Sequence, residues 1–111
     1  MTMAKHTVAL IAAAVVMASG HAAAADVANG KKKAQEVCAA CHNMDGVSTV
    51  PDYPKLAGQY PDYLAKALRD YKSGARKNPI MAGMAAGLSQ KDIDDLAEYY
   101  ATLPPVLQTR M

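Results

Sequence analysis

Apolar residues recur at helical spacing in two segments of the chain. In residues 61–73 they fall on one face of a helix that Pro61 can begin and Gly74 can end. That face consists of Tyr63, Leu64, Ala67, Leu68 and Tyr71. In residues 90–102 a second face follows a capping box that begins at Ser89. Its members are Ile93, Leu96, Ala97 and Tyr100, with Tyr99 beside them. The pattern predicts two amphipathic helices at these positions.

A third helix is predicted to begin at Asp26 or Asn29, either of which can cap it, and to run to residue 42. Gly30 and Ala34 lie four residues apart on it, and such a stripe of small side chains lets a second helix approach closely. Prolines and glycines between positions 43 and 59 indicate a loop. Because no segment alternates in the manner of a strand, we expect an all-α domain with three main helices.

The N-terminal segment has the pattern of a secretory signal peptide. A short basic stretch precedes an apolar run from Thr7 to Ala18, and an A-x-A cleavage site follows at Ala23–Ala25. A retained membrane anchor is the alternative, but this run falls short of the roughly 20 residues that span a bilayer. We therefore expect cleavage after Ala25, with residues 1–25 removed and residues 26–111 forming one domain in an oxidising compartment.

Composition indicates that something other than protein fills the centre of this domain. The 86 residues after Ala25 carry 11 basic and 10 acidic side chains, a balance that argues against nucleic acid as a partner. They include no Phe and no Trp, and the aromatic residues are all Tyr. A domain of this size buries only about 60–65% of its unfolded surface, so its own core is marginal. A large apolar cofactor would supply the missing bulk.

The sequence Cys38-Ala39-Ala40-Cys41-His42 has the pattern of a c-type haem attachment site. Two cysteines three apart lie about one helical turn apart, so their sulfurs can add to the two vinyl groups of one haem. His42 follows at once and can ligate the iron as the proximal ligand. This motif predicts one haem c, held covalently through Cys38 and Cys41 and surrounded by the helices and loops of the domain.

Two other functions of a C-x-x-C sequence are disfavoured. A thiol–disulfide redox pair is typical of a βαβ context, and the chain has no such pattern. A structural zinc site needs four ligands, whereas this motif supplies three and no Cys or His follows it.

The sixth ligand of the iron is predicted to be a methionine. His42 is the only histidine after residue 25, so a second histidine ligand within one chain is excluded. The remaining possibilities are Met, Lys, water or an open site, and of these we favour Met. Met44 is too close to His42 to reach the opposite face of the haem, and Met111 lies in the tail. Met81 and Met84 remain; they lie in the connection between the last two helices, where Pro79 breaks the chain and a short helical turn can follow. Their alternative role is flexible core packing.

A ligating histidine normally donates its second ring N–H to a fixed acceptor, and a backbone carbonyl in the loop after His42 is the natural one.

The chain resembles small bacterial class I cytochromes c, in the subgroup that includes dihaem relatives built from two such modules. The resemblance runs from about Gly30 to Leu103. It rests on the haem motif and on Tyr53-Pro54-Lys55-Leu56-Ala57-Gly58-Gln59, Tyr63-Leu64, Lys72-Ser73-Gly74 and Leu88-Ser89. By the resemblance, Met81 is the iron ligand rather than Met84, because the family's methionine lies seven residues before the Leu of that last pair. It also implies that the Pro51 carbonyl accepts the hydrogen bond from His42, and that Gly30 and Ala34 pack against Leu96 and Tyr99.

The function expected from motif and resemblance is that of a periplasmic electron carrier rather than an enzyme. Such a monohaem protein would pass single electrons between larger redox proteins of a respiratory or related chain, docking weakly as a monomer through the haem rim near Lys55 and Lys77. Its lack of a membrane span after cleavage fits this role. The alternatives are a haem subunit held in an oxidoreductase complex, and an open-site peroxidase or gas sensor. The last is disfavoured because the domain has no second histidine for acid–base work.

Overall fold

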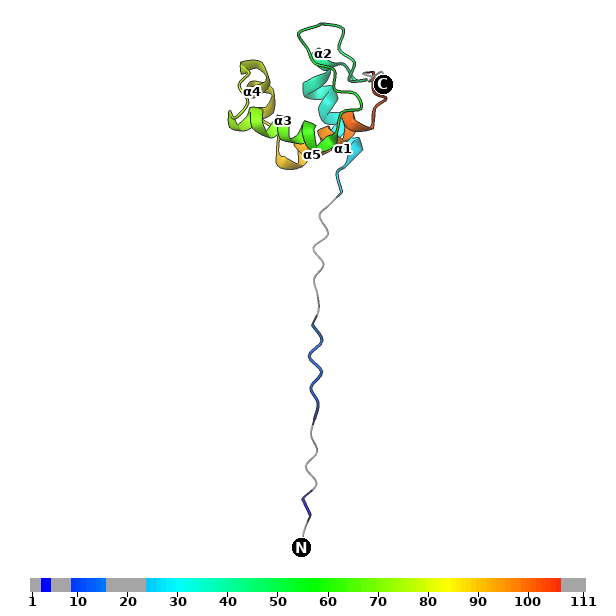
Figure 1. Ribbon diagram of the computed structural model, residues 1–111, viewed down its shortest axis with the longest axis vertical. Helices are drawn as coiled ribbons and strands as arrows, with labels where there is room; N and C mark the ends of the chain where they lie inside the picture. Colours follow the sequence, from blue (N-terminus) through cyan, green and yellow to red (C-terminus); the bar gives the residue numbers. More distant parts are fainter. Residues whose placement is uncertain (1–2, 5–8, 16–23, 107–111) are drawn as a thin grey trace, which may run out of the picture.

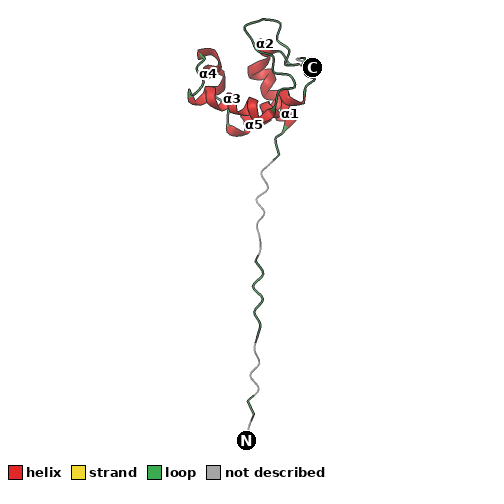
Figure 2. Ribbon diagram, in the orientation of Figure 1, coloured by secondary structure: helices red, strands yellow, loops and turns green. Residues whose placement is uncertain are grey.

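The computed structural model describes residues 3–4, 9–15 and 24–106. Much of the expected signal peptide, including Ala23 of its cleavage site, lies outside the described residues, as does Met111. The helices are α1 (Val27–Lys33), the π-helix η1 (Ala34–Cys38), α2 (Ala39–His42), α3 (Pro61–Ser73), α4 (Pro79–Ala86) and α5 (Gln90–Thr102). Within the described ranges every regular element is helical, as expected from the sequence (Figures 1 and 2). None of these helices has the length and hydrophobicity of a membrane span.

The helix that carries the haem motif has an irregular middle. Of the two candidate caps, Asp26 begins α1, and its carboxylate accepts a hydrogen bond from the Asn29 amide at 3.1 Å. The chain then widens into η1, where the Ala39 amide donates to the Ala34 carbonyl five residues back. It returns to α-helical geometry for α2, which ends at His42. Wide turns of this kind are frequent at functional sites.

Helix α1 crosses α5 at very short range. A Cβ atom placed on Gly30 would lie 2.0 Å from the Asp95 carbonyl oxygen and 2.9 Å from Tyr99 Cβ, so only glycine fits. Ala34, one turn further, is completely buried. The expected crossing of these two helices is therefore present. Tyr99 is a neighbour of Gly30 as expected, but the nearest atoms belong to the Asp95 backbone rather than to Leu96. Figure 1 shows the two helices side by side below α2.

The other helices begin and end where local signals predicted. Pro61 occupies the first turn of α3, and Gly74 ends that helix in the left-handed conformation, with φ of 86°. The capping box at Ser89 is formed, and α5 follows it. The expected turn after Pro79 is a full two-turn helix, α4, capped by the Asn78 side chain. The buried core is made of Ala34, Leu64, Ala65, Leu88, Ile93, Leu96, Ala97, Tyr99 and Tyr100.

The loop between α2 and α3 is fastened to α5 by tyrosines. The Tyr99 hydroxyl donates to the Met44 carbonyl at 2.6 Å, and the Tyr100 hydroxyl donates to the Asn43 carbonyl at 3.3 Å. Further along the loop, the Gly58 amide donates to the Tyr100 carbonyl at 3.0 Å. These bonds hold the loop against the body of the domain, where it forms one wall of the site described next.

Candidate haem site

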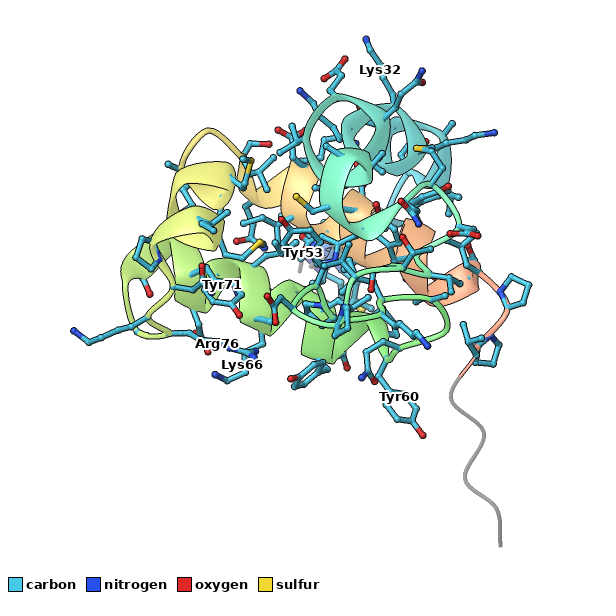
Figure 3. All side chains as sticks on the ribbon, turned by 90° about the horizontal axis from the view of Figure 1, so that it is seen from above. Lys32, Tyr53, Tyr60, Lys66, Tyr71 and Arg76 are labelled. Atoms are coloured by element: carbon cyan, nitrogen blue, oxygen red, sulfur yellow. The ribbon has the colours of Figure 1, made fainter. Side chains whose placement is uncertain are left out.

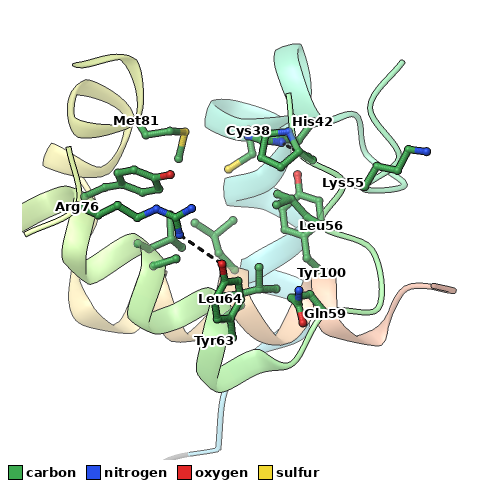
Figure 4. Close-up of a pocket in the computed structure, with 16 residues that line it drawn as sticks. Cys38, His42, Lys55, Leu56, Gln59, Tyr63, Leu64, Arg76, Met81 and Tyr100 are labelled. Carbon is green, nitrogen blue, oxygen red and sulfur yellow. Dashed lines mark hydrogen bonds between the residues drawn. The ribbon is translucent and has the colours of Figure 1, made fainter. Parts of the chain in front are cut away.

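A cleft lies between α3, α4 and α5 on one side and the end of η1–α2 with its loop on the other (Figure 4). It holds about 840 Å³ of empty space, counting the part open to solvent. The lining residues are Cys38, His42, Pro54, Lys55, Leu56, Gln59, Tyr63, Leu64, Ala67, Leu68, Tyr71, Arg76, Met81, Leu96, Ala97 and Tyr100. All five members of the predicted apolar face of α3 line this cleft, so that face packs against the site rather than against protein alone.

His42 is buried, and its ring is fixed by the backbone of the loop. Its Nδ1 lies 2.8 Å from the Pro54 carbonyl oxygen. Because a carbonyl can only accept, Nδ1 carries the proton and the lone pair of Nε2 is left for a metal.

The prediction that the Pro51 carbonyl accepts the hydrogen bond from His42 is wrong, because the Pro54 carbonyl does so. Pro51 lies in an exposed turn closed by the Tyr53 amide on the Val50 carbonyl at 3.1 Å. This turn points the chain outward, and the loop returns to the imidazole only at Pro54. Sequence spacing gave no measure of how many residues the turn would consume.

The two cysteines are not joined to each other, and they differ in their surroundings. Cys38 lines the cleft, while Cys41 is partly buried one turn further on and is not among the lining residues. Burial raises the pKa of the Cys38 thiol to about 11, against a smaller lowering by a hydrogen bond with Tyr100. A thiol of that pKa is protonated at neutral pH and is a poor redox nucleophile. This disfavours the thiol–disulfide alternative.

Of the candidate methionines, the structure brings Met81 to the cleft. Met81 is half-buried and lies across the cleft from His42, with Cys38 between them in the view of Figure 4. Its position is set by Asn78, whose side chain accepts from the Met81 amide at 3.1 Å. Met84, one turn further along α4, is 45% exposed and does not line the cleft. Met44 packs against the core instead.

Sequence reasoning missed Arg76, which lies in the turn after α3. Its guanidinium stands 4.9 Å from the centre of the Tyr71 ring and donates to the Tyr63 hydroxyl at 3.4 Å. Both tyrosines belong to the cleft-lining face of α3, and the exposed Arg76 lines the cleft with them. Figure 4 shows its side chain directed toward Tyr63, and Figure 3 shows it beside Tyr71. The local sequence contains no signal for this, because an arginine after a helix normally faces solvent.

The residues present fit a haem. The walls are mostly aliphatic or aromatic and include two small side chains, Ala67 and Ala97, which leave room for a flat apolar group. An imidazole nitrogen and a thioether sulfur are typical axial ligands of cytochrome iron. A cysteine at the cleft suits thioether attachment, and the cation of Arg76 suits the carboxylates that haem carries at its edge.

Comparison with known proteins agrees with this assignment. The family model for cytochrome c matches residues 27–104. Cytochrome c4 of Thiocapsa roseopersicina is 49% identical over 89 residues, which cover 77% of this chain and 46% of that relative. Cytochrome c-554(548) of Halomonas halodenitrificans is 43% identical over 82 residues, which cover 71% of this chain and 98% of that relative. The chain thus spans less than half the length of the cytochrome c4 relative.

The fold is also found in a solved structure. Thiosulfate dehydrogenase from Marichromatium purpuratum matches with a TM-score of 0.68 and 30% identity, over 77% of this chain and 20% of that chain. The resemblance drawn from the sequence is confirmed by these matches. The chain belongs to the cytochrome c family, and it holds haem c covalently through Cys38 and Cys41.

Proposed function

We propose that this chain is a periplasmic monohaem cytochrome that carries single electrons between larger redox proteins. The observation that carries the proposal is the placement of His42 and Met81 on either side of one apolar cleft (Figure 4). When bound, the haem supplies a one-electron iron couple. His42 and Met81 would hold the iron from both sides, which would favour electron transfer over binding or activation of a small molecule there.

Hydrogen bonds within the protein fix the positions of His42 and Met81, the two proposed iron ligands. Nε2 of His42 is oriented by the bond from Nδ1 to the Pro54 carbonyl, and the Met81 backbone is held by Asn78. Ligands held in this way would keep the coordination nearly the same in both oxidation states, so little reorganisation would accompany transfer. The thioether of Met81 would favour ferrous iron, and the mostly apolar walls would disfavour the extra ferric charge; both would raise the reduction potential.

Partners would dock weakly at the open side of the cleft. Tyr63 lines the cleft and is 50% exposed, so part of its ring is available to a partner there. Lys55 lines the cleft and Lys77 is exposed near Arg76, so the contact is rimmed by positive charge. Other lysines, such as Lys32 and Lys66, project away from the body of the domain (Figure 3). Such a small, mixed surface suits transient docking whose rate depends only moderately on salt.

A haem subunit of an oxidoreductase complex is the second candidate. It is favoured by the match to one fifth of the thiosulfate dehydrogenase chain, in which the matching part belongs to a larger enzyme. The alignment with cytochrome c-554(548) covers 98% of that relative, which is therefore no larger than one such domain. This match favours a free carrier instead. In either case residues 1–25 would act as a leader removed on export.

The test is electrochemical titration of the holoprotein purified after export with its own leader. A reversible one-electron transition, no peroxide turnover and no binding of carbon monoxide to the reduced protein are expected. Rapid peroxide turnover by the wild-type protein would contradict the carrier function. Co-purification in a stable complex with a dehydrogenase would support the subunit alternative over the free carrier.

A further inference from the structure

Asp95 is a buried acid that takes no part in the haem site. Its side chain is 1% exposed at the crossing of α1 and α5. One carboxylate oxygen accepts from the backbone nitrogen of Asp26 at 2.7 Å, and the other accepts from the Asn29 side-chain amide at 2.7 Å. The second oxygen also meets the Lys91 ammonium, one helical turn before it on α5. A buried carboxylate needs such partners, since an unpaired buried charge is strongly destabilising.

The charged groups around Asp95 carry an excess of negative charge that one more cation would balance. Asp26 and Asp92 contribute two more carboxylates from α1 and α5, and Asn29 also reaches Asp92 at 3.5 Å. Lys91 and Lys33 are the nearby cations, and the Lys91 side chain is 66% exposed. Three carboxylates thus face two lysines, and the most buried of the three points at a backbone nitrogen.

That nitrogen belongs to the residue that the leader pattern predicts to be the first of the mature chain. Hydrolysis of the Ala25–Asp26 peptide bond by a leader peptidase consumes one water. It leaves a carboxylate on Ala25 and converts the nitrogen of Asp26 from an amide into an α-ammonium. We propose that Asp95 is the receptor for this processed N-terminus and forms a buried ion pair with it. The proposal rests on leader removal after Ala25, and it is independent of electron transfer.

The new group suits the site better than the amide does. An ammonium brings three N–H donors and a positive charge to a place where the amide brings one N–H, and charge-assisted bonds are roughly twice as strong as neutral ones. A positive charge at the start of α1 is opposed by the helix dipole, but the Asp26 and Asp95 carboxylates offset this. In a chain cleaved one residue earlier, after Ala24, the nitrogen of Asp26 would remain an amide. The α-ammonium would then belong to Ala25 and would not be the group that meets Asp95.

The pairing would secure the helix that carries the haem motif. Gly30, one turn along α1, touches the Asp95 backbone, so the side chain and the main chain of one residue both hold the start of α1. Cys38 and His42 follow on the same continuous helix. Leader processing would therefore complete the packing of the segment that holds the haem.

The test uses holoprotein exported with its own leader. Its intact mass should equal residues 26–111 plus haem. The pKa of the α-amine, followed by competitive acetylation over a range of pH and read by mass spectrometry, should lie above the ordinary value of about 8. In Asp95→Asn that pKa should fall back toward the ordinary value. Asp94→Asn is the matched control, because Asp94 is the neighbouring residue on α5 and its side chain is 50% exposed.

Stability should follow the same titration. Because pairing raises the pKa of the α-amine in the folded state, its stabilisation is fully present below about pH 8 and is lost as the pH rises through the raised value. The excess stability of wild type over Asp95→Asn should therefore shrink in the alkaline range, with an unchanged haem spectrum throughout.

Two outcomes would overturn the proposal: a mature mass that begins upstream of Asp26, or an ordinary α-amine pKa in the wild-type protein. Both are measured on wild type, so they decide the question even where Asp95→Asn does not accumulate. Neither outcome would affect the proposed electron transfer.

Discussion

Nδ1 of His42 lies 2.8 Å from the carbonyl oxygen of Pro54, a residue twelve positions further along the sequence. In the proposed haem site, this hydrogen bond would leave Nε2 of His42 for the iron and raise the basicity of that nitrogen. Because a basic ligand stabilises ferric iron more than ferrous iron, the bond would lower the reduction potential, whereas a Met81 ligand and burial would raise it.

Replacing Pro54 should therefore raise the reduction potential. Pro54→Ala keeps the carbonyl group but releases the fixed φ of proline, so the acceptor is held less firmly against the imidazole. Potentiometric titration should give a small rise for Pro54→Ala. Pro51→Ala, in the exposed turn, should leave the potential unchanged; a shift for Pro51→Ala alone would mean that Pro51 governs the ligand after all.

The two methionines of α4 should respond differently to substitution. Met81→Ala should abolish the weak red absorption band of sulfur-to-ferric-iron charge transfer, lower the potential, and open the iron to cyanide or carbon monoxide. Met84→Ala should retain the band. It should cost only on the order of 1 kcal/mol in unfolding free energy, because a side chain 45% exposed loses little burial.

Absorption spectra of the oxidised variants check this directly. If the band vanished in Met84→Ala and persisted in Met81→Ala, Met84 would be the ligand. A wild-type spectrum without the band would favour the open-site alternative.

Gly30→Ala should be severely destabilising. Its methyl group would meet the Asp95 carbonyl oxygen at 2.0 Å, which forces α1 and α5 apart. The expected loss is roughly 3 kcal/mol of unfolding free energy, near the upper end for overpacking. Gly83→Ala on α4 is the matched control, because its methyl group would have no neighbour within 4 Å. It should stabilise the helix by about 0.5–1 kcal/mol. Guanidinium unfolding of the holoproteins measures both, and equal effects would show that the helix crossing is less tight than described.

Removing the charge of Arg76 should lower the potential. A cation at the rim of the cleft favours the more reduced iron, and its contacts with Tyr63 and Tyr71 hold it there. Arg76→Gln should give a lower potential by spectroelectrochemistry. Lys77→Gln, which removes the same charge from the next residue, should have a smaller effect because Lys77 does not line the cleft. Equal shifts would indicate a general charge effect without a special place for Arg76.

The sequence predicted the elements that depend on local signals. Helix α5 spans the expected residues because Ser89 caps it locally, and α3 ends at Gly74 because glycine accepts positive φ there. The cofactor could also be predicted from the sequence, because the haem attachment motif is a contiguous run of residues. Helices, motif and the choice of Met81 for the cleft thus follow from spacing and resemblance.

What the sequence did not predict depends on contacts between distant residues. The choice of Pro54 over Pro51 depends on how the loop turns, and the burial of Asp95 depends on the nitrogen of Asp26, 69 residues away. Arg76 reaches the cleft through the tyrosines of α3. Such contacts depend on the tertiary structure. The spacing of apolar residues along the sequence contains little information about them.

The π-helical turn η1 fixes the length of the segment before the haem motif. Gly30, Ala34, Cys38 and His42 follow one another at intervals of four residues. On a regular α-helix each such interval rotates by about 40°, so the last of them would drift away from the face set by the first. The wider turn of η1 rotates the later residues of this series back toward the face of the first. The same face of the helix therefore packs against α5 at Gly30 and reaches the cleft at His42. Substitutions here change side chains only, whereas deletion of one residue between Ala34 and Cys38 would swing the imidazole by about 100°. The number of residues between Ala34 and Cys38 therefore matters to the position of His42 as much as their identity does.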